Sequence, residues 1–328
     1  MNKKTVVFIC TCSVIAITGL FVAICAGAKS IPLKIVWDSI FHYEDVLDMQ
    51  LVRDVRIPRV ICTALIGGIL GVTGAMMQGV TRNPIAEPSL MGITQGATFA
   101  IAIAGASPVI YGLLGNTVAA FLGAMVSGLL VLAFSMKSAR NVNLSRLLLA
   151  GTALSTFFIS MATIIALLTN KSQNLAFWIS GGFRAVTWDS VKLVLIVGGI
   201  TTCLALFMAP KINIVNLGEE VCIGLGENPV KIRMITLLLL IPMCAVCVAV
   251  AGNIAFIGLI VPHIIRKLLG QDYRMIMPVS FLFGATLVIW ADVLARLVNQ
   301  PYETPIGLFT SLVGVPLFIW MIRKENVG

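Results

Sequence analysis

The segment Gly224-Leu-Gly-Glu-Asn-Pro-Val-Lys231 is the part of this sequence that comes nearest to a nucleotide-binding motif. A phosphate loop reads G-x-x-x-x-G-K-[ST], because its backbone N–H groups cradle the phosphates and its lysine reaches them. Here Pro229, Val230 and Lys231 stand where Gly, Lys and Ser or Thr are required. The sequence therefore predicts no nucleotide site, and any ATP-driven action needs another subunit.

Two ionisable residues lie within apolar segments, and neither has the partners that catalysis requires. His263 follows Pro262, and we interpret a lone histidine there as a helix-end or packing group, with a proton relay as the alternative. Asp292 has Arg296 four residues further on, where the two side chains can pair on one helix face. The sequence offers no second aspartate for an intramembrane protease and no chain of carboxylates for proton coupling.

Composition explains where these residues must sit. The 328 residues are 59% hydrophobic and 11% charged, whereas a soluble domain carries roughly 25% charged residues. Apolar runs of this length predict an all-α polytopic membrane protein, because a helix satisfies its own backbone in lipid. The net charge of +9 comes without a basic cluster interleaved with aromatics, so no nucleic-acid partner is predicted. The cysteines lie almost all in apolar segments, where we expect them to pack; no metal site is predicted.

Taking about 20 apolar residues per span, the sequence predicts ten spans within a single transmembrane domain, residues 1–328. They are 5–27, 60–80, 90–107, 111–135, 146–168, 191–209, 234–251, 254–268, 276–298 and 306–322. With both termini in the cytoplasm, 14 of the 23 basic residues fall inside, as the positive-inside bias requires. Leaving out the short span 254–268 reverses that bias. Residues 28–59 then form an external loop.

A polar insert at 210–233 falls on the cytoplasmic side of this topology. It carries three glutamates, three basic residues and three glycines between two apolar spans. We interpret it as the place where a water-soluble partner binds.

Two patterns concern helix packing. Gly67-x-x-x-Gly71 is a spacing of small residues that permits close packing, which we expect within the bundle rather than at a dimer face. An inverted repeat is a further expectation, because Arg59 precedes Gly79 by 20 residues and Arg233 precedes Gly252 by 19.

Taken together, the motifs resemble the FecCD-type permeases of cobalamin and iron-siderophore ABC importers, over nearly the whole chain except the first 30 residues. The motifs are Arg56-Ile-Pro58-Arg59, Gly74-Ala-Met-Met-Gln78-Gly79, Asn83-Pro84-Ile-Ala86-Glu87-Pro88, Gly92, Gly96, Gly252-Asn-Ile-Ala-Phe256-Ile-Gly258-Leu-Ile-Val-Pro262-His263-Ile-Ile-Arg266, Ala291-Asp292-Val-Leu-Ala-Arg296, Glu303-Thr-Pro305-Ile-Gly307 and Gly314-Val-Pro316.

The resemblance implies a type II ABC importer in a bacterial cytoplasmic membrane. It implies ten helices per subunit, a second permease subunit that is identical or paralogous, and helices two, five and ten along the path. Two ATPase subunits would bind ATP and Mg²⁺, this chain would hold no cofactor itself, and an external substrate-binding protein would deliver the ligand. The expected cargo is an iron-siderophore complex. Haem and cobalamin are alternatives, and an ion-coupled secondary transporter is the alternative mechanism.

The resemblance also assigns residues, still as expectations. It implies a coupling loop of two short helices that docks on the ATPase, with Leu217, Gly218, Glu219, Gly224, Leu225 and Gly226. It implies external arginines that pair with glutamates of the binding protein, namely Arg56, Arg59 and Arg296. It implies a cytoplasmic gate at Asn143 and Leu144, where the family often has small hydroxyl residues. Structural and pathway roles fall to Gln78, Asn83, Pro84, Glu87, Pro88, Gly258, Pro262, His263 and Arg266.

Overall fold

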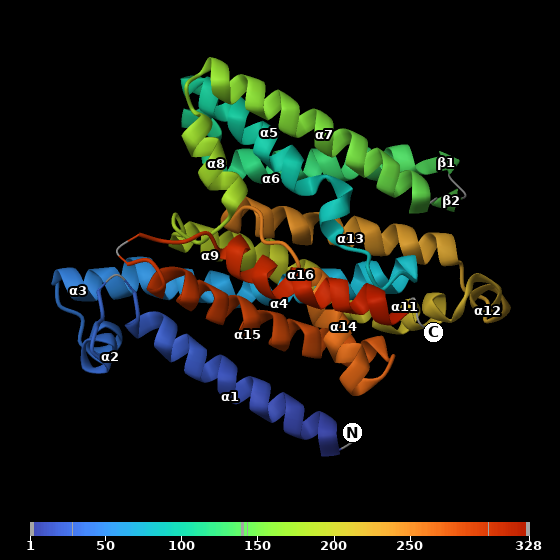
Figure 1. The fold of residues 1–328 in the computed structure, drawn as a ribbon, viewed down its shortest axis with the longest axis horizontal. Helices are drawn as coiled ribbons and strands as arrows, with labels where there is room; N and C mark the ends of the chain where they lie inside the picture. The colour runs from blue at the N-terminus through green and yellow to red at the C-terminus, as the bar shows by residue number, and fades with distance from the viewer. Residues whose placement is uncertain (1–2, 28, 139–140, 143, 301, 326–328) are drawn as a thin grey trace.

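The structure is a computed structural model that describes residues 3–27, 29–138, 141–142, 144–300 and 302–325. Its helices run roughly along one direction, and their connections gather at the two ends of the bundle (Figure 1). Helices α2 (Leu33–Phe41) and α3 (Leu47–Gln50) lie at one end, and α11 (Ala209–Leu217) and α12 (Glu219–Gly224) lie at the other. The all-α class is thus confirmed.

The remaining elements have these bounds. The bundle helices are α1 (Lys3–Cys25), α4 (Ile57–Thr81), α5 (Ile93–Ala106), α6 (Pro108–Ser135), α7 (Leu144–Leu168), α13 (Pro229–Ala251), α14 (Ile257–Leu269), α15 (Tyr273–Leu297) and α16 (Ile306–Glu325). One further bundle helix is built from α9 (Trp188–Leu193), η3 (Val194–Gly199) and α10 (Ile200–Phe207). The short elements are η1 (Leu51–Arg56), η2 (Pro88–Met91), α8 (Ser172–Ser180) and a hairpin of β1 (Met136–Ser138) and β2 (Asn141–Val142).

Each predicted span coincides with a bundle helix. In the described part of the chain, seven helices are long and apolar enough to cross a membrane. The helix of the span predicted at 254–268, α14, has 13 residues and is therefore about 20 Å long, short of the roughly 30 Å of a bilayer core. The number of spans and the side of the termini stay predictions.

The segment 28–59, predicted as an external loop, is helical in its second half. Residues Leu47–Thr81 form one apolar helical run of 35 residues, in which η1 continues into α4. The charged residues between Arg53 and Arg59 suggested an end to the span. The helix continues because the guanidinium groups of Arg56 and Arg59 find partners inside the protein.

Helix α4 lies at the centre of the bundle, and its glycines bring it against two neighbours. A Cβ atom built on Gly67 would lie 2.5 Å from the carbonyl oxygen of Gly284 on α15. A Cβ atom built on Gly74 would lie 1.9 Å from the carbonyl oxygen of Gly258 on α14. Only glycine permits backbones to approach this closely, so the predicted packing within the bundle is confirmed.

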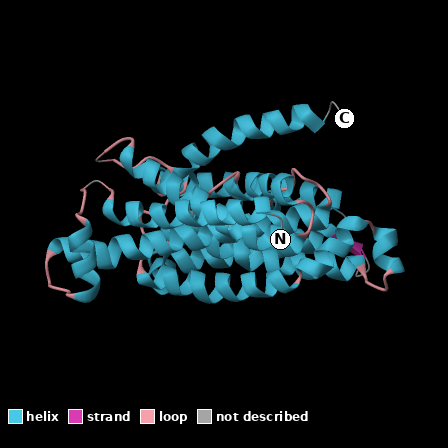
Figure 2. Ribbon diagram, turned by 90° about the horizontal axis from the view of Figure 1, so that it is seen from below, coloured by secondary structure: helices cyan, strands magenta, loops and turns pink. Residues whose placement is uncertain are grey.

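Helix α16 lies at the edge of the molecule. Seen from below, it stands apart from the other helices (Figure 2). Its apolar side chains are largely exposed, with 68% of Leu312 and 55% of Val313 accessible. Helix α7 is similar, since Leu149 and Phe157 are 69% and 51% exposed. These two helices present apolar surface that lipid or another subunit can cover.

Helices α4 and α13 run in opposite directions along the bundle (Figure 1). The inverted repeat that this arrangement would allow stays a prediction.

Candidate functional site

The motif residues of the two halves of the chain meet around α14. Pro262 has no backbone N–H, so the carbonyl group of Gly258 loses its partner within the helix. The side-chain amide of Gln78 on α4 donates to that carbonyl oxygen at 3.3 Å and to that of Leu259 at 3.1 Å. Arg266 in turn donates from Nη2 to Gln78 Oε1 at 2.5 Å. One glutamine therefore completes the hydrogen bonding of a proline-broken helix.

The beginning of α14 is held by the same segment of the chain. Phe256, the residue before the helix, has φ 70°, which non-glycine residues rarely adopt. Its backbone N–H donates to Glu87 Oε1 at 2.9 Å. Pro88 lies against Gly258, and Asn83 shapes the preceding turn by accepting the N–H of Ile85 at 3.0 Å. Residues 78–88 thus support both the start and the middle of α14.

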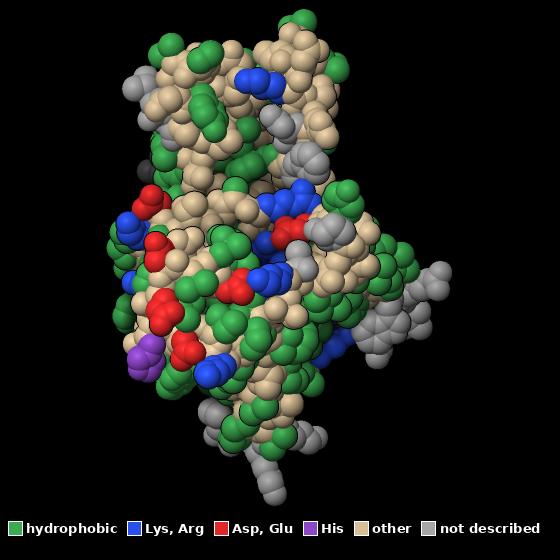
Figure 3. Space-filling model, turned by 90° about the vertical axis from the view of Figure 1, so that its left-hand side faces the viewer, with side chains coloured by type: hydrophobic (Ala, Val, Ile, Leu, Met, Phe, Trp, Pro, Cys, Tyr) green, Lys and Arg blue, Asp and Glu red, His purple; other side chains and the backbone are tan. Residues whose placement is uncertain are grey.

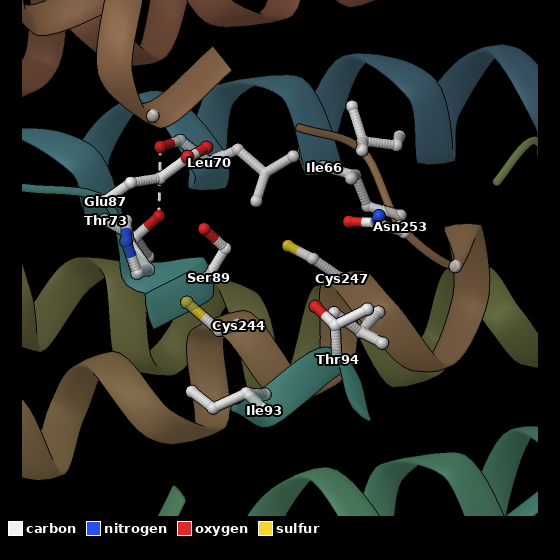
Figure 4. Close-up of a pocket in the computed structure, with 15 residues that line it drawn as sticks. Ile66, Leu70, Thr73, Glu87, Ser89, Ile93, Thr94, Cys244, Cys247 and Asn253 are labelled. Carbon is white, nitrogen blue, oxygen red and sulfur yellow. Dashed lines mark hydrogen bonds between the residues drawn. The ribbon is translucent and has the colours of Figure 1, made fainter. Parts of the chain in front are cut away.

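A small space of ≈ 40 Å³ lies beside this junction. Figure 4 shows Glu87, Ser89, and Cys244 and Cys247 of α13 around it. The unwound stretch 252–256 between α13 and α14 contributes Asn253 to its lining. Irregular backbone in a membrane protein is expected where protein or an internal space surrounds it, as here.

The polar insert folds into α11 and α12, which meet at Gly218 with φ 128°. Arg233, only 6% exposed, fixes α12: its Nη1 donates to Glu219 Oε1 at 2.5 Å and its Nε donates to the carbonyl oxygen of Val80 at 3.2 Å. Because Arg233 is on α13 and Val80 ends α4, the second short helix is joined to two bundle helices.

Helix α11 is joined to a third bundle helix. Asn213 Nδ2 donates to Asp272 Oδ1 at 2.6 Å, and Asn213 Oδ1 accepts the N–H of Tyr273 at 2.8 Å. Asp272 also caps α15 by accepting the N–H of Arg274 at 2.9 Å. The amide of Asn213 and this backbone N–H hold the pKa of Asp272 below its usual value.

The outer surface of the two short helices carries exposed apolar side chains as well as charged ones. Leu217, Val221, Ile223 and Leu225 are 64%, 47%, 64% and 60% exposed. Gly224 and Gly226 flank Leu225, and Gly226 has φ 78°, which turns the chain back toward α13. Four exposed apolar side chains within nine residues, outside the bundle, indicate a surface that another molecule covers.

The three arginines assigned to docking are buried. Arg56, Arg59 and Arg296 are 5%, 7% and 5% exposed. Arg59 Nη2 lies 2.8 Å from Asp292 Oδ1, and its Nη1 lies 2.6 Å from Glu303 Oε1.

Arg296 and Arg56 donate hydrogen bonds to carbonyl groups at the end of α1. Arg296 Nη2 lies 2.9 Å from Asp292 Oδ2, and its Nη1 donates to the carbonyl oxygen of Ala23 at 2.9 Å. Arg56 Nη1 donates to the carbonyl oxygens of Ile24 and Cys25, each at 2.7 Å. Internal acids and carbonyl groups engage these guanidinium groups in the structure, and their pairing with glutamates of another protein stays a prediction.

The end that carries α2 and α3 nevertheless has a charged surface. Figure 3 views this end and shows acidic and basic side chains interspersed over it. Lys34, Arg53 and Asp54 belong to its exposed residues. Of the gate assignment, Asn143 and the side chain of Leu144 lie outside the described residues. Within the described part, no group of three or more His, Cys, Asp or Glu residues is placed to hold a metal ion.

Sequence reasoning missed several contacts. Glu303 and Arg233 were not recognised as partners of Arg59 and Glu219. For Gln78 a signal was present, since Pro262 inside an apolar run implies a carbonyl group that needs a donor.

Comparison with known proteins now decides the family. The model of the FecCD transport family matches residues 15–324. The chain belongs to the FecCD transport family. One FecCD relative, the iron(3+)-hydroxamate import system permease protein FhuB of Bacillus subtilis (strain 168), is 42% identical over 94% of this chain and 81% of its own. Another, the hemin transport system permease protein HmuU of Yersinia pestis, is 33% identical over 92% of this chain and 90% of its own.

The FecCD fold is also found among solved structures. A metal-chelate type ABC transporter in an inward-facing conformation superimposes with a TM-score of 0.83 at 26% identity, over 97% of this chain and 99% of that chain. As a FecCD protein whose described residues include seven helices long and apolar enough to span a bilayer, this chain is a multi-pass membrane protein of the permease type.

Proposed function

We propose that this chain is the permease subunit of an ATP-driven importer for a ferric siderophore in a bacterial cytoplasmic membrane. The observation that carries the proposal is the exposed apolar surface of α11 and α12, Leu217 to Leu225, in a member of the FecCD family. This surface gives an ATPase subunit a place to bind. The 42% identity to an iron(3+)-hydroxamate permease favours a ferric hydroxamate as cargo.

Internal contacts of the two short helices transmit a movement of the bound ATPase to the bundle helices. A displacement of α12 acts on α13 and on the end of α4 through Glu219, Arg233 and the carbonyl group of Val80. A displacement of α11 acts on the start of α15 through Asn213 and Asp272. Hydrogen bonds that involve a charged side chain are stronger than neutral ones, so the helices are expected to move together. ATP and Mg²⁺ are bound by the ATPases, and this chain supplies no cofactor.

The remaining partners follow from the surfaces. The external substrate-binding protein docks at the end with α2 and α3, where exposed residues such as Lys34 and Arg53 offer charges. A second permease subunit, identical or paralogous, covers apolar surface of α7 or α16, and lipid covers the rest.

Uptake by the reconstituted complex tests the function. Proteoliposomes that contain this permease, its ATPases and the binding protein should transport a radiolabelled ferric hydroxamate. Transport should require ATP on the side of the membrane where the ATPases lie. Replacing the Walker lysine of the ATPase should abolish uptake, and an uncoupler should leave it unchanged. Uptake that survives the lysine replacement and stops with the uncoupler would establish an ion-coupled transporter instead.

The apolar surface of the coupling loop gives a second prediction. The double substitution Ile223→Ser and Leu225→Ser should lower transport-coupled ATP hydrolysis at least about tenfold, because each side chain would lose apolar contact with the ATPase. Both side chains are exposed, so folding and membrane insertion should persist.

Leu47→Ser is the matched control, since Leu47 is 74% exposed at the opposite end. ATPase association measured by co-purification should fall only in the double variant. Unchanged association and hydrolysis in that variant would remove α12 from the interface.

Haem is the second candidate cargo, because the hemin permease HmuU is also a relative. Binding assays of the cognate external protein with ferric hydroxamates, haem and cobalamin distinguish the three ligands.

A further inference from the structure

A hollow of ≈ 440 Å³ lies beside α8, where α5 and α7 end and α6 begins. Gly105 lies in the last turn of α5, Pro108 is the first residue of α6, and Thr169 directly follows α7. The hairpin of β1 and β2 lies at the opposite end of α6 and α7 (Figure 1). The hollow is therefore level with helix ends on the side that the sequence predicts to be external. Helix ends lie near the headgroups of a bilayer, outside its core of about 30 Å.

Lys171 brings a positive charge to this hollow, and the surrounding helices bring no negative charge. No aspartate or glutamate occurs between residues 88 and 188, a range that includes all of α5 to α8. Lys171 Nζ donates to the carbonyl oxygen of Gly105, which is neutral. Lys171 takes part in none of the ion pairs that lysines form among the described residues. An ammonium group has three N–H donors, so this single bond leaves capacity for an anion.

Two neutral polar side chains of α6 add to this capacity. Tyr111 and Asn116 both line the hollow and are exposed. Neither side chain has a hydrogen-bond partner among the described residues. A tyrosine hydroxyl and an asparagine amide can both donate hydrogen bonds. One cation and two neutral donors therefore line a space that no acidic side chain lines.

The rest of the lining is largely apolar. It comes from α5, α7 and α8 and includes Ile101, Ala102, Ala166 and Leu175. Exposed apolar side chains stand next to the lining residues in the chain, since Val109, Leu167 and Leu168 are 70%, 63% and 80% exposed. In a multi-pass membrane protein, such a surface faces hydrocarbon or another subunit. A space with one cation and apolar walls matches an anionic amphiphile better than a small anion from water.

We propose that this hollow binds an anionic phospholipid, with the phosphate at Lys171 and the hydrocarbon against the apolar walls. Lysine is a common phosphate ligand in proteins. Tyrosine and tryptophan are enriched where a membrane protein meets the headgroups, and Tyr111 and Trp178 both line the hollow. A zwitterionic lipid brings a cation of its own, which Lys171 would repel, so the site favours a headgroup without one. Once bound, the lipid connects the ends of α5, α6, α7 and α8.

Lipid binding to the purified full-length permease tests the site. Native mass spectrometry measures the affinity for phosphatidylglycerol and for phosphatidylcholine. We expect phosphatidylglycerol to bind more tightly and, in nanodiscs, to raise the melting temperature more, because a ligand of the folded state stabilises it. Lys171→Gln should weaken phosphatidylglycerol binding about fivefold and leave phosphatidylcholine binding unchanged. Lys171→Arg should keep the preference.

Two further variants make the result specific. Lys192→Gln is the matched control, because Lys192 is 69% exposed, pairs with Asp189 and does not line the hollow. It should leave the preference for phosphatidylglycerol unchanged. Tyr111→Phe removes one hydroxyl from a different helix and should weaken phosphatidylglycerol binding independently of Lys171. Lys171, Lys192 and Tyr111 are exposed, so folding should persist in each variant.

Three results would overturn the proposal: equal affinity of the wild type for the two lipids, an unchanged preference in Lys171→Gln, or an equal loss in Lys192→Gln. Inorganic phosphate or a ferric siderophore that stabilises the protein through Lys171, while phosphatidylglycerol does not, would assign the hollow to a ligand from water and contradict the lipid. None of these readouts involves transport, so their failure leaves the proposed importer function untouched.

Discussion

Replacing Asp292 with alanine is expected to destabilise the protein by about 3–5 kcal/mol, the range for breaking a buried ion pair by removing one partner. The carboxylate is 1% exposed and faces two guanidinium groups, with Oδ1 2.8 Å from Arg59 Nη2 and Oδ2 2.9 Å from Arg296 Nη2. Its removal leaves Arg296 buried beside carbonyl groups alone, while Arg59 keeps only the half-buried Glu303. Unfolding in detergent, followed by tryptophan fluorescence, measures the loss.

Asp189→Ala is the control. Asp189 pairs with Lys192 at 2.9 Å, but their side chains are 88% and 69% exposed, and exposed pairs contribute about 0–1 kcal/mol. Equal losses in the two variants would show that Asp292 is not buried among arginines. Replacing Arg59 should lower stability for the same reason, because it removes a partner of both Asp292 and Glu303.

Gly74→Ala is expected to cost at least about 1–3 kcal/mol, the usual penalty of overpacking, and to abolish most uptake. The new Cβ would lie 1.9 Å from the carbonyl oxygen and 2.5 Å from the Cα atom of Gly258. Backbone atoms cannot rotate away as a side chain can, so α4 and α14 would have to separate. The separation would also disturb the hydrogen bonds from Gln78 to α14. Melting temperature and reconstituted uptake measure the two effects.

Gly199→Ala controls for the chemistry of the substitution. Gly199 has helical backbone angles, and a Cβ there would meet nothing within 4 Å. Alanine at such a position is expected to be neutral or to stabilise by up to about 1 kcal/mol. Were Gly74→Ala to behave in the same way, the close crossing of α4 and α14 would be disproved.

Hydropathy predicted the helices well, because an apolar run of span length has few alternatives in lipid. It failed at the start of α4. Whether Arg59 ends a helix depends on Asp292, 233 residues away, and no local pattern contains that contact. The same limit applies to docking, since buried and exposed arginines are alike in sequence.

Some features of the candidate site could be predicted from the sequence and others could not. The turns at Gly218 and Gly226 follow from glycine, which adopts positive φ without strain, and the polar composition of 210–233 marked the insert. The exposure of Ile223 and Leu225 could not be predicted, because Ile223 lies in α12 and Leu225 directly follows it, and the buried face of this short helix is set by α13 and α11. The contact between Glu219 and Arg233 depends on how the insert folds back on α13.

The dependence of α14 on residues 78–88 has a consequence for the order of assembly. Gln78, 180 residues before Gly258, donates to the carbonyl group of Gly258. Glu87, 169 residues before Phe256, accepts the N–H of Phe256. During synthesis the N-terminal half leaves the ribosome first, so these acceptors and donors are already in the membrane when α14 arrives. Helix α14 is thus templated by an earlier helix, and the second half of the protein completes a hydrogen-bonded surface that the first half has prepared.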